Sequence, residues 1–251
     1  MRLNVQTNFP SIQQQLDVLG RQAPFVVAVS LTRTAKDVQT AIKGEMRRAF
    51  DRPTAYTLNG MFLKPASKTN LEARVWLKDD AFGPGTQADR YLGPQITGGV
   101  RGQKGMERLL QATGLMATGQ FAVPGPGARM DSNGNVARSQ IIQIMSQLKV
   151  QERAGYESRA NSGTRSRRTV TRQGVTYFAL KTVTRGLQPG IYIKRKTRRG
   201  TTIKPVFLFV SKVLYRPRLK FFEVGNATAL ERFPVHFNTE MRKAIANARL
   251  N

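Results

Sequence analysis

The chain has 251 residues, 40% of them hydrophobic, and its 41 lysines and arginines against 15 aspartates and glutamates give a formal net charge of +26. That length suits one large domain or two modest ones, and the hydrophobic fraction argues against wholesale disorder. The absence of cysteine excludes disulfides, thiolate metal sites and cysteine nucleophiles. Residues 1–6 lack the apolar core of a signal peptide, and no run reaches the roughly 18 apolar residues of a membrane span.

Apolar residues recur at helical spacing twice near the amino end. Residues 10–19 are expected to form a short helix that closes at a glycine. A longer helix is expected over residues 25–50. It must end there because Arg52 precedes Pro53, and a residue before proline avoids the helical conformation.

The next stretch mixes clear and ambiguous patterns. Residues 54–63 fit a strand and a short helix equally well. Residues 70–78 alternate apolar and polar, which predicts a half-buried strand with Trp76 on the face opposite the aliphatic side chains. Glycine and proline recur over residues 79–90 and 93–99, so both stretches are expected to be irregular.

Two amphipathic helices are expected in the middle of the chain, over residues 104–113 and 136–150. Between them, residues 123–135 are rich in glycine, proline and asparagine and are expected to form a loop. Residues 151–169 have few apolar side chains and many arginines, serines and glycines, which predicts a basic linker or mobile loop.

That segment is the best candidate for a domain boundary. The expected division is a mixed helical region over 1–150, the basic linker or loop over 151–169, and a basic sheet with a closing helix over 170–251. One compact domain made of the first and last of these regions is the alternative.

Three strands are expected after the linker, over residues 175–183, 190–196 and 203–210, with a hairpin tip at 198–200. The third is apolar on both faces and is therefore expected to be central, with Pro205 at its start. Its phenylalanines are expected in the core.

The chain closes with a further expected helix, in which Phe237 and Met241 face inward and Glu240 faces outward. The fold class that follows is α+β, a small, mostly antiparallel sheet packed with helices and carrying long basic loops.

The charge is concentrated in one window. No acidic residue lies between Glu157 and Glu223, whereas 17 lysines and arginines do. Such a surface repels itself, so it is expected to face nucleic acid or an acidic protein rather than solvent alone. The aromatic residues Tyr177, Tyr192 and Tyr215 lie among these charges. The candidate contact residues, chosen because they fall in predicted loops and at the hairpin tip, are Arg165, Arg167, Arg168, Arg195, Lys196, Arg198 and Arg199.

Patterns that would indicate an enzyme are weak. His236 is the only histidine, and a lone histidine is usually a packed or surface residue. Asp79, Asp80 and Asp89 share one glycine-rich stretch and would serve a metal-dependent nuclease, but no further carboxylate or basic catalytic partner stands at a telling spacing. The sequence therefore predicts a protein that is not an enzyme and holds no cofactor or metal.

A second glycine-rich stretch, residues 98–105, precedes a predicted helix. It departs from the phosphate-loop pattern because Lys104 is followed by glycine rather than serine or threonine. We expect it to be a basic contact loop that uses Arg101 and Lys104.

Several short stretches together resemble the minor tail protein Z and tail-completion group of tailed-bacteriophage virions. The resemblance is spread over most of the chain, and its motifs are structural. It rests on residues 31–38, 50–54, 57–59, 64–66, 91–96, 98–101, 186–192, 204–210, 215 and 237–250. The basic segment 151–169 is longer than this group leads one to expect.

The resemblance implies a structural virion protein that completes the tail or neck and joins the tail to the head connector as a ring of copies. Its implied partners are the connector and the tail tube or tail terminator, with non-specific contact to phage DNA. It would reside in the virion, and in the host cytoplasm during assembly. A packaging or chromosome-associated protein that binds nucleic acid without sequence preference is the alternative, and a metal-dependent nuclease is a third hypothesis.

Overall fold

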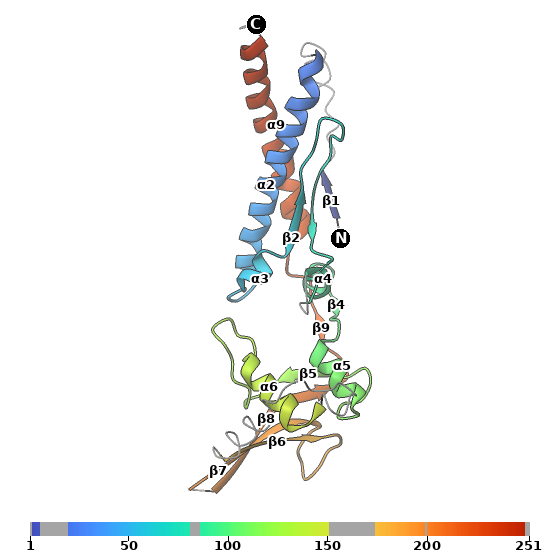
Figure 1. Cartoon of the computed structure of the whole chain (residues 1–251), viewed down its shortest axis with the longest axis vertical. Coiled ribbons are helices and arrows are strands. Elements are labelled where there is room, and N and C mark those ends of the chain that lie inside the picture. Colours follow the sequence, from blue (N-terminus) through green and yellow to red (C-terminus); the bar gives the residue numbers. More distant parts are fainter. Residues whose placement is uncertain (1, 6–19, 81–85, 151–173, 199, 249–251) are drawn as a thin grey trace. The chain divides into compact units, whose positions relative to one another are not determined.

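The structure is a computed structural model that describes residues 2–5, 20–80, 86–150, 174–198 and 200–248. It divides the chain into two compact units. Unit 1 comprises residues 1–99 and 215–251, and unit 2 comprises residues 100–214. Helices and small antiparallel sheets make up the described part of both units (Figure 1), so the expected α+β class is confirmed.

A pair of long helices organises unit 1. Helix α2 (Ala23–Ala49) packs along helix α9 (Phe221–Ala248), and the two lie side by side in Figure 1. Helix α2 confirms the helix expected over 25–50, and its ten buried residues recur at helical spacing. It ends at Phe50, whose extended backbone leads into the turn before Pro53.

Ion pairs join the two helices at Arg33 and Asp37 of α2. Arg33 of α2 is bonded to Glu240 of α9. Four residues further along α2, Asp37 accepts a hydrogen bond from Arg232 Nε at 2.9 Å. The increasing numbers on one helix meet decreasing numbers on the other, so the pair is antiparallel. Glu240 is only 8% exposed, which corrects the expectation that it faces outward, because the Arg33 guanidinium offsets the cost of burying its carboxylate.

A three-stranded antiparallel sheet covers this helix pair. Its order is β1 (Arg2–Val5), β3 (Ala73–Leu77) and β2 (Met61–Lys64). In β3, alternate residues are buried from Ala73 to Leu77, and Trp76 lies on the other face, as expected. The ambiguous stretch 54–63 contains both a short helix and the start of a strand, because helix α3 (Ala55–Leu58) is followed by β2.

One stretch expected to be irregular is a helix. Helix α4 (Ala88–Thr97) contains Pro94, which lacks the N–H that an interior helical residue normally donates. A tertiary contact overrides that preference, because Gln95 is 7% exposed and its carbonyl accepts hydrogen bonds from the backbone N–H groups of Arg218 and Leu219. The helix ends at Gly98, whose φ of 76° suits glycine and whose added Cβ would lie 3.0 Å from Pro217.

Unit 2 is built on a four-stranded antiparallel sheet. Its order is β5 (Phe121–Pro124), β8 (Gly200–Val210), β7 (Gly190–Thr197) and β6 (Val175–Leu180). The three strands expected after the linker are confirmed, and β8 is central as expected. Strand β5 was not expected, because its residues open a stretch whose glycines and prolines indicate a loop.

Two short helices belong to the core of unit 2. Helices α5 (Gly105–Ala112) and α6 (Arg138–Gln147) match the expected helices within a few residues at each end. Their buried residues Leu110 and Ile144 join a cluster with Ile191, Phe207 and Phe209 of the sheet. Phe207 and Phe209 are therefore core residues, as predicted.

The chain passes between the units at two short strands, β4 (Gly99–Val100) and β9 (Leu214–Tyr215), which pair with each other. This division differs from the expected one, because α9 packs on α2 and so returns the end of the chain to the amino-terminal unit. The expected linker 151–169 and the expected helix over 10–19 lie outside the described residues.

The packing of α9 on α2 predicts a large effect of truncating Phe237, which is 2% exposed. We expect Phe237→Ala to lower the free energy of unfolding of unit 1 by about 3–5 kcal/mol. Arg242→Ala is the control on the same helix, because Arg242 is exposed, and it should cost less than about 0.5 kcal/mol. Urea denaturation followed by the fluorescence of Trp76, the only tryptophan, reports on unit 1; equal effects of the two variants would contradict this packing.

Candidate functional site

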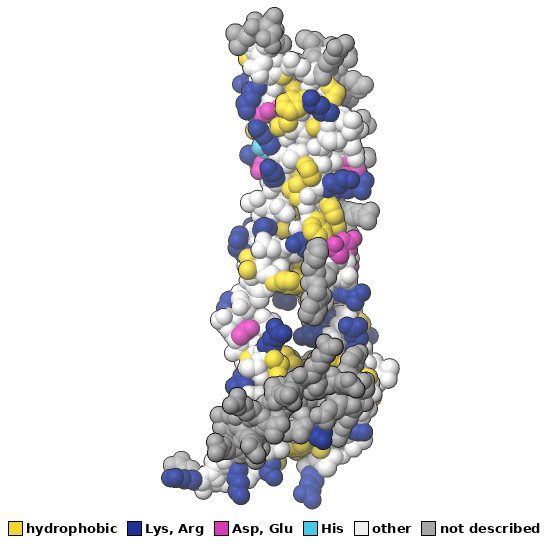
Figure 2. Space-filling view, viewed as in Figure 1, with side chains coloured by type: hydrophobic (Ala, Val, Ile, Leu, Met, Phe, Trp, Pro, Cys, Tyr) yellow, Lys and Arg dark blue, Asp and Glu magenta, His cyan; other side chains and the backbone are white. Residues whose placement is uncertain are grey.

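Strands β7 and β8 continue beyond the core as a basic ribbon, defined here as residues 194–198 and 200–204. Every residue of the ribbon is exposed, whereas the preceding residues Ile191, Tyr192 and Ile193 are buried. The strands stay in register along it, with Arg195 opposite Thr202. Its described cations are Lys194, Arg195, Lys196, Arg198 and Lys204. Figure 2 shows lysines and arginines, and no acidic side chain, at its free end.

Strand alternation divides these cations between two faces. Lys194 and Lys196 of β7 lie on one face, and Arg195 lies on the other with Thr197. Lys204 pairs with Ile193, so it shares the face of Arg195. This face continues toward the apolar core, which begins at Ile193.

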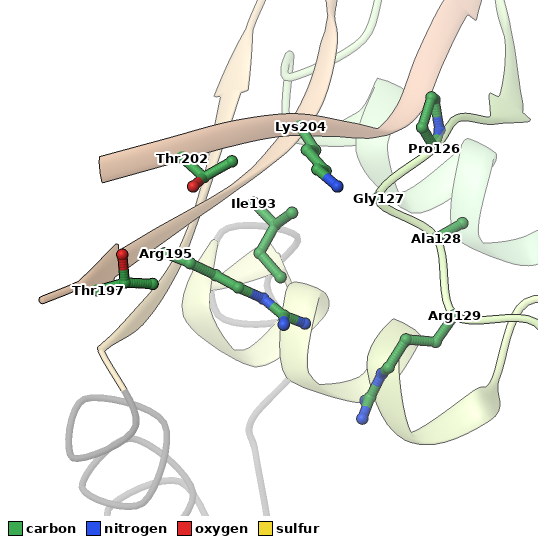
Figure 3. Close-up of a pocket in the computed structure, with 9 residues that line it drawn as sticks. All are labelled: Pro126, Gly127, Ala128, Arg129, Ile193, Arg195, Thr197, Thr202 and Lys204. Carbon is green, nitrogen blue, oxygen red and sulfur yellow. The ribbon is translucent and has the colours of Figure 1, made fainter. Parts of the chain in front are cut away.

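A pocket of about 330 Å³ lies on this second face. The side chains of Arg195 and Lys204 leave the ribbon on the side that faces segment 126–129, which contributes Arg129 (Figure 3). Two threonine side chains border the pocket along the ribbon. The described residues that line it are Pro126, Gly127, Ala128, Arg129, Ile193, Arg195, Thr197, Thr202 and Lys204, and these include three cations and no acid.

The wall opposite the ribbon is held by the backbone of β8. Gly127 N donates to the Pro205 carbonyl at 2.7 Å, and Gly125 N donates to the Val206 carbonyl at 2.9 Å. Gly127 is required at this close approach, because a Cβ there would lie 2.9 Å from the Pro205 oxygen and 3.0 Å from Ile193.

Pro205 itself lies within β8 rather than at its start, which corrects the sequence expectation. The pairing of β7 and β8 shifts at this point, so that Ile191 faces Phe207 while Tyr192 faces Pro205. Such a bulge leaves one residue unpaired and accommodates a proline, which has no N–H to donate to the ladder.

Gln140 of α6 also holds segment 126–129 in place, through two hydrogen bonds to its backbone. Its side chain is fully buried; its amide oxygen accepts from Arg129 N at 2.6 Å and its Nε2 donates to the Gly127 carbonyl at 3.0 Å. Sequence reasoning missed Gln140, Arg129 and Lys204, and the only available signal was a glutamine among the apolar positions of a helix.

Few acidic groups balance the charge of this unit. Residues 100–214 contain 21 lysines and arginines against four aspartates and glutamates, a net charge of +17. Of the acids that the structure describes there, Glu107 is fully buried, and Asp131 Oδ1 accepts from the backbone N–H groups of Asn133 and Asn135. Among the described residues, neither acid forms an ion pair with the ribbon.

Arg101 does not lie in an exposed contact loop, which corrects the expectation for residues 98–105. Arg101 is 8% exposed, and its Nη1 donates to Glu107 Oε2 at 2.8 Å. Its guanidinium also lies 4.9 Å from the ring centre of Phe121. It is therefore a core residue that ties α5 to β5. Lys104 is exposed, and its backbone N–H donates to Glu107 Oε2 at 2.7 Å at the start of α5.

The remaining predicted contact residues divide into two groups. Arg195, Lys196 and Arg198 are exposed on the ribbon, but Arg195 and Lys196 lie within strand β7 rather than in a loop or at the hairpin tip. Of the aromatics expected near them, Tyr177 and Tyr192 are 5% and 2% exposed, so they are core residues and not stacking platforms. The candidates Arg165, Arg167, Arg168 and Arg199 lie outside the described residues.

The candidate catalytic groups are found in unit 1. His236 Nε2 lies 2.7 Å from Asp37 Oδ2, between α9 and α2. Trp76 Nε1 donates to Asp79 Oδ1 at 3.3 Å, and Asp89 lies in the first turn of α4. Within the described part of the chain, no group of three or more histidines, aspartates and glutamates could hold a metal ion.

No protein-family model, curated protein or solved structure matches this chain. The resemblance to phage tail proteins therefore stays a prediction. Of the helices that the structure describes, none is both long and apolar enough to cross a bilayer.

The buried Arg101–Glu107 pair predicts a pH-dependent contribution to the stability of unit 2. Burial raises the pKa of Glu107, but hydrogen bonds from the Arg101 guanidinium and from the N–H groups of Lys104 and Ala122 outweigh it, so the pKa lies below its ordinary 4.5. A carboxyl whose pKa is lowered by folding stabilises the fold above its ordinary pKa, and that stabilisation is lost as pH falls through the lowered value.

We therefore expect Glu107→Gln to destabilise unit 2 by about 3 kcal/mol at neutral pH, since it leaves Arg101 buried without its carboxylate. The difference from wild type should shrink as pH falls below 4.5 and through the lowered pKa of Glu107. Hydrogen exchange of the β8 amides measures this difference in the stability of unit 2. Asp51→Asn is the control, because Asp51 is 80% exposed and its pair contributes little; a difference that does not change with pH would contradict the assignment.

Proposed function

We propose that this protein is a structural component of a tailed-bacteriophage particle that binds nucleic acid through its basic ribbon. Binding to a polyanion is supported by the ribbon, whose described lysines and arginines are exposed on both faces. The setting comes from the sequence resemblance to tail-completion proteins.

Phosphodiester groups suit the ribbon better than bases do. Lysine, arginine and threonine side chains donate hydrogen bonds to phosphate oxygens, and the described part of the ribbon carries no aromatic side chain on which a base could stack. Binding through phosphates is independent of sequence, and it releases counterions, so its strength falls steeply with salt. Phage DNA of every sequence passes through the neck, so a neck protein that contacts it has to bind independently of sequence.

Unit 1 supplies features that suit contact between copies. The order β1-β3-β2 makes β1 and β2 edge strands, and edge strands are commonly covered by a neighbouring chain. Leu230 and Val235 of α9 are 66% and 49% exposed. A closed ring would use such surfaces repeatedly, with the same contact at each step.

The DNA contact is tested by removing ribbon cations. We expect Lys194→Ala/Lys196→Ala/Arg198→Ala to weaken binding to a short duplex at least tenfold at low salt. The slope of log K against log salt should fall by about 2–3, since each phosphate contact contributes about 0.9. Fluorescence anisotropy over a salt series measures both.

The matched control removes three exposed cations from unit 1 instead, with Lys36→Ala/Arg47→Ala/Arg242→Ala. It should leave the slope within about one contact of wild type. Equal losses in both triple variants, or no DNA binding by wild type, would overturn the ribbon as the contact.

The virion setting is tested separately. We expect the purified protein to form a closed oligomer by analytical ultracentrifugation, and electron microscopy of purified particles to place it as a ring at the head–tail junction. A monomer that binds DNA strongly at low salt but is absent from particles would favour the packaging or chromosome-associated alternative.

A further inference from the structure

The pocket beside Arg129 is separate from the outward cations of the ribbon. It gathers three cationic side chains from two parts of the chain, Arg195 and Lys204 from the ribbon and Arg129 from segment 126–129 (Figure 3). In the part of the chain that the structure describes, no carboxylate pairs with any of them; Arg129 Nη2 instead donates to the neutral Gln143 at 3.4 Å. Like charges brought together repel, and an anion between them offsets that cost.

The chemistry of the lining selects the kind of anion. Guanidinium groups form paired hydrogen bonds with phosphate oxygens, and the Lys204 ammonium group adds single donors. The Thr197 hydroxyl is not such a donor, because it already donates to the Gly200 carbonyl at 3.0 Å. Among the described lining residues, the apolar side chains are Ile193, Pro126 and Ala128, and none is aromatic. The pocket therefore suits a phosphate and its attached sugar rather than a base.

The volume sets the size of the occupant. About 330 Å³ is at the lower end of the range of small-molecule pockets, roughly 300–1,000 Å³. That space suits a phosphate with its attached sugar. Among the described residues, Arg129, Arg195 and Lys204 are exposed, so a nucleic-acid chain can reach them.

The wall is rigid, which distinguishes the pocket from a flexible cationic surface. Backbone hydrogen bonds from Gly125 and Gly127 fasten segment 126–129 to β8, and the buried Gln140 holds the backbone of Arg129. A fixed wall keeps Arg129 near the ribbon in the absence of ligand, so less conformational entropy is lost on binding.

We propose that this pocket is a seat for one phosphate group of a nucleic-acid backbone, held by Arg129, Arg195 and Lys204. The inference rests on the proposed function for the source of the phosphate. It adds one fixed phosphate contact, where the ribbon leaves the core, to the contacts that the outward cations make.

The test compares two variants that lose the same charge. Arg129→Gln/Arg195→Gln removes two cations from the pocket, and Lys194→Gln/Lys196→Gln removes two from the opposite face of the ribbon. All four side chains are exposed, so both variants should fold, which amide NMR spectra check. We expect the pocket variant to bind a short duplex about tenfold more weakly than the control variant at the same salt concentration.

A second measurement tests whether the pocket binds a phosphate group at a defined site. Inorganic phosphate is titrated into the wild-type protein at constant ionic strength, while the side-chain Nε–Hε signals of Arg129 and Arg195 are followed by NMR. Saturable shifts of both signals, lost in Gln140→Leu as Arg129 loses its fixed backbone, support a built phosphate site.

The outcomes separate the two proposals. Equal weakening of DNA binding by the two double variants overturns the phosphate seat and leaves the ribbon contact standing. If wild type binds no DNA, the proposed function fails; saturable phosphate shifts would then assign the pocket to free phosphate and overturn its nucleic-acid source.

Discussion

Repulsion among the cations of unit 2 is the constraint on which the rest of this unit depends. With 21 lysines and arginines against four acids, the unit gains little from ion pairs, so apolar burial must hold the sheet together. The core residues Ile191, Phe207 and Phe209 supply that burial beneath α5 and α6. The one buried ion pair, among the described residues, joins Arg101 to Glu107 and thereby keeps a cation inside rather than on the surface.

The same core gives the charges a fixed geometry. Beyond Ile193 the strands leave the apolar cluster but keep their hydrogen-bonded register, so the cations of the ribbon are spaced by the strand repeat. The bulge at Pro205 exposes a carbonyl that Gly127 binds, which brings Arg129 to the face of Arg195 and Lys204. A rigid support turns a basic segment into a surface with a distinct pocket.

Unit 1 follows a different electrostatic rule. Its two long helices carry acids that meet cations across the contact, as Asp37 does with Arg232 and His236. Burial raises the pKa of Asp37, and the bonds from Arg232 and His236 outweigh it and leave that pKa lowered. These pairs define the antiparallel register of α2 and α9, and the apolar residues buried between the two helices stabilise the helix pair. The lone histidine therefore has a packing role in this pair.

The sequence by itself determined the helices and strands with strong periodicity, the α+β class and the exposed cations Arg195, Lys196 and Arg198. These depend on local spacing, which a reader of the chain can count. Only the tertiary structure decided the helix at Pro94, the burial of Arg101 and Glu240, and the return of α9 to unit 1. Each depends on a partner distant in sequence: Arg218 and Leu219 for α4, β5 for Arg101, and Arg33 for Glu240. The pocket belongs to the same class. Arg129 and Arg195 line it together because the bonds of Gly127 and Gln140 hold segment 126–129 beside β8, and no local pattern encodes the approach of segments more than sixty residues apart.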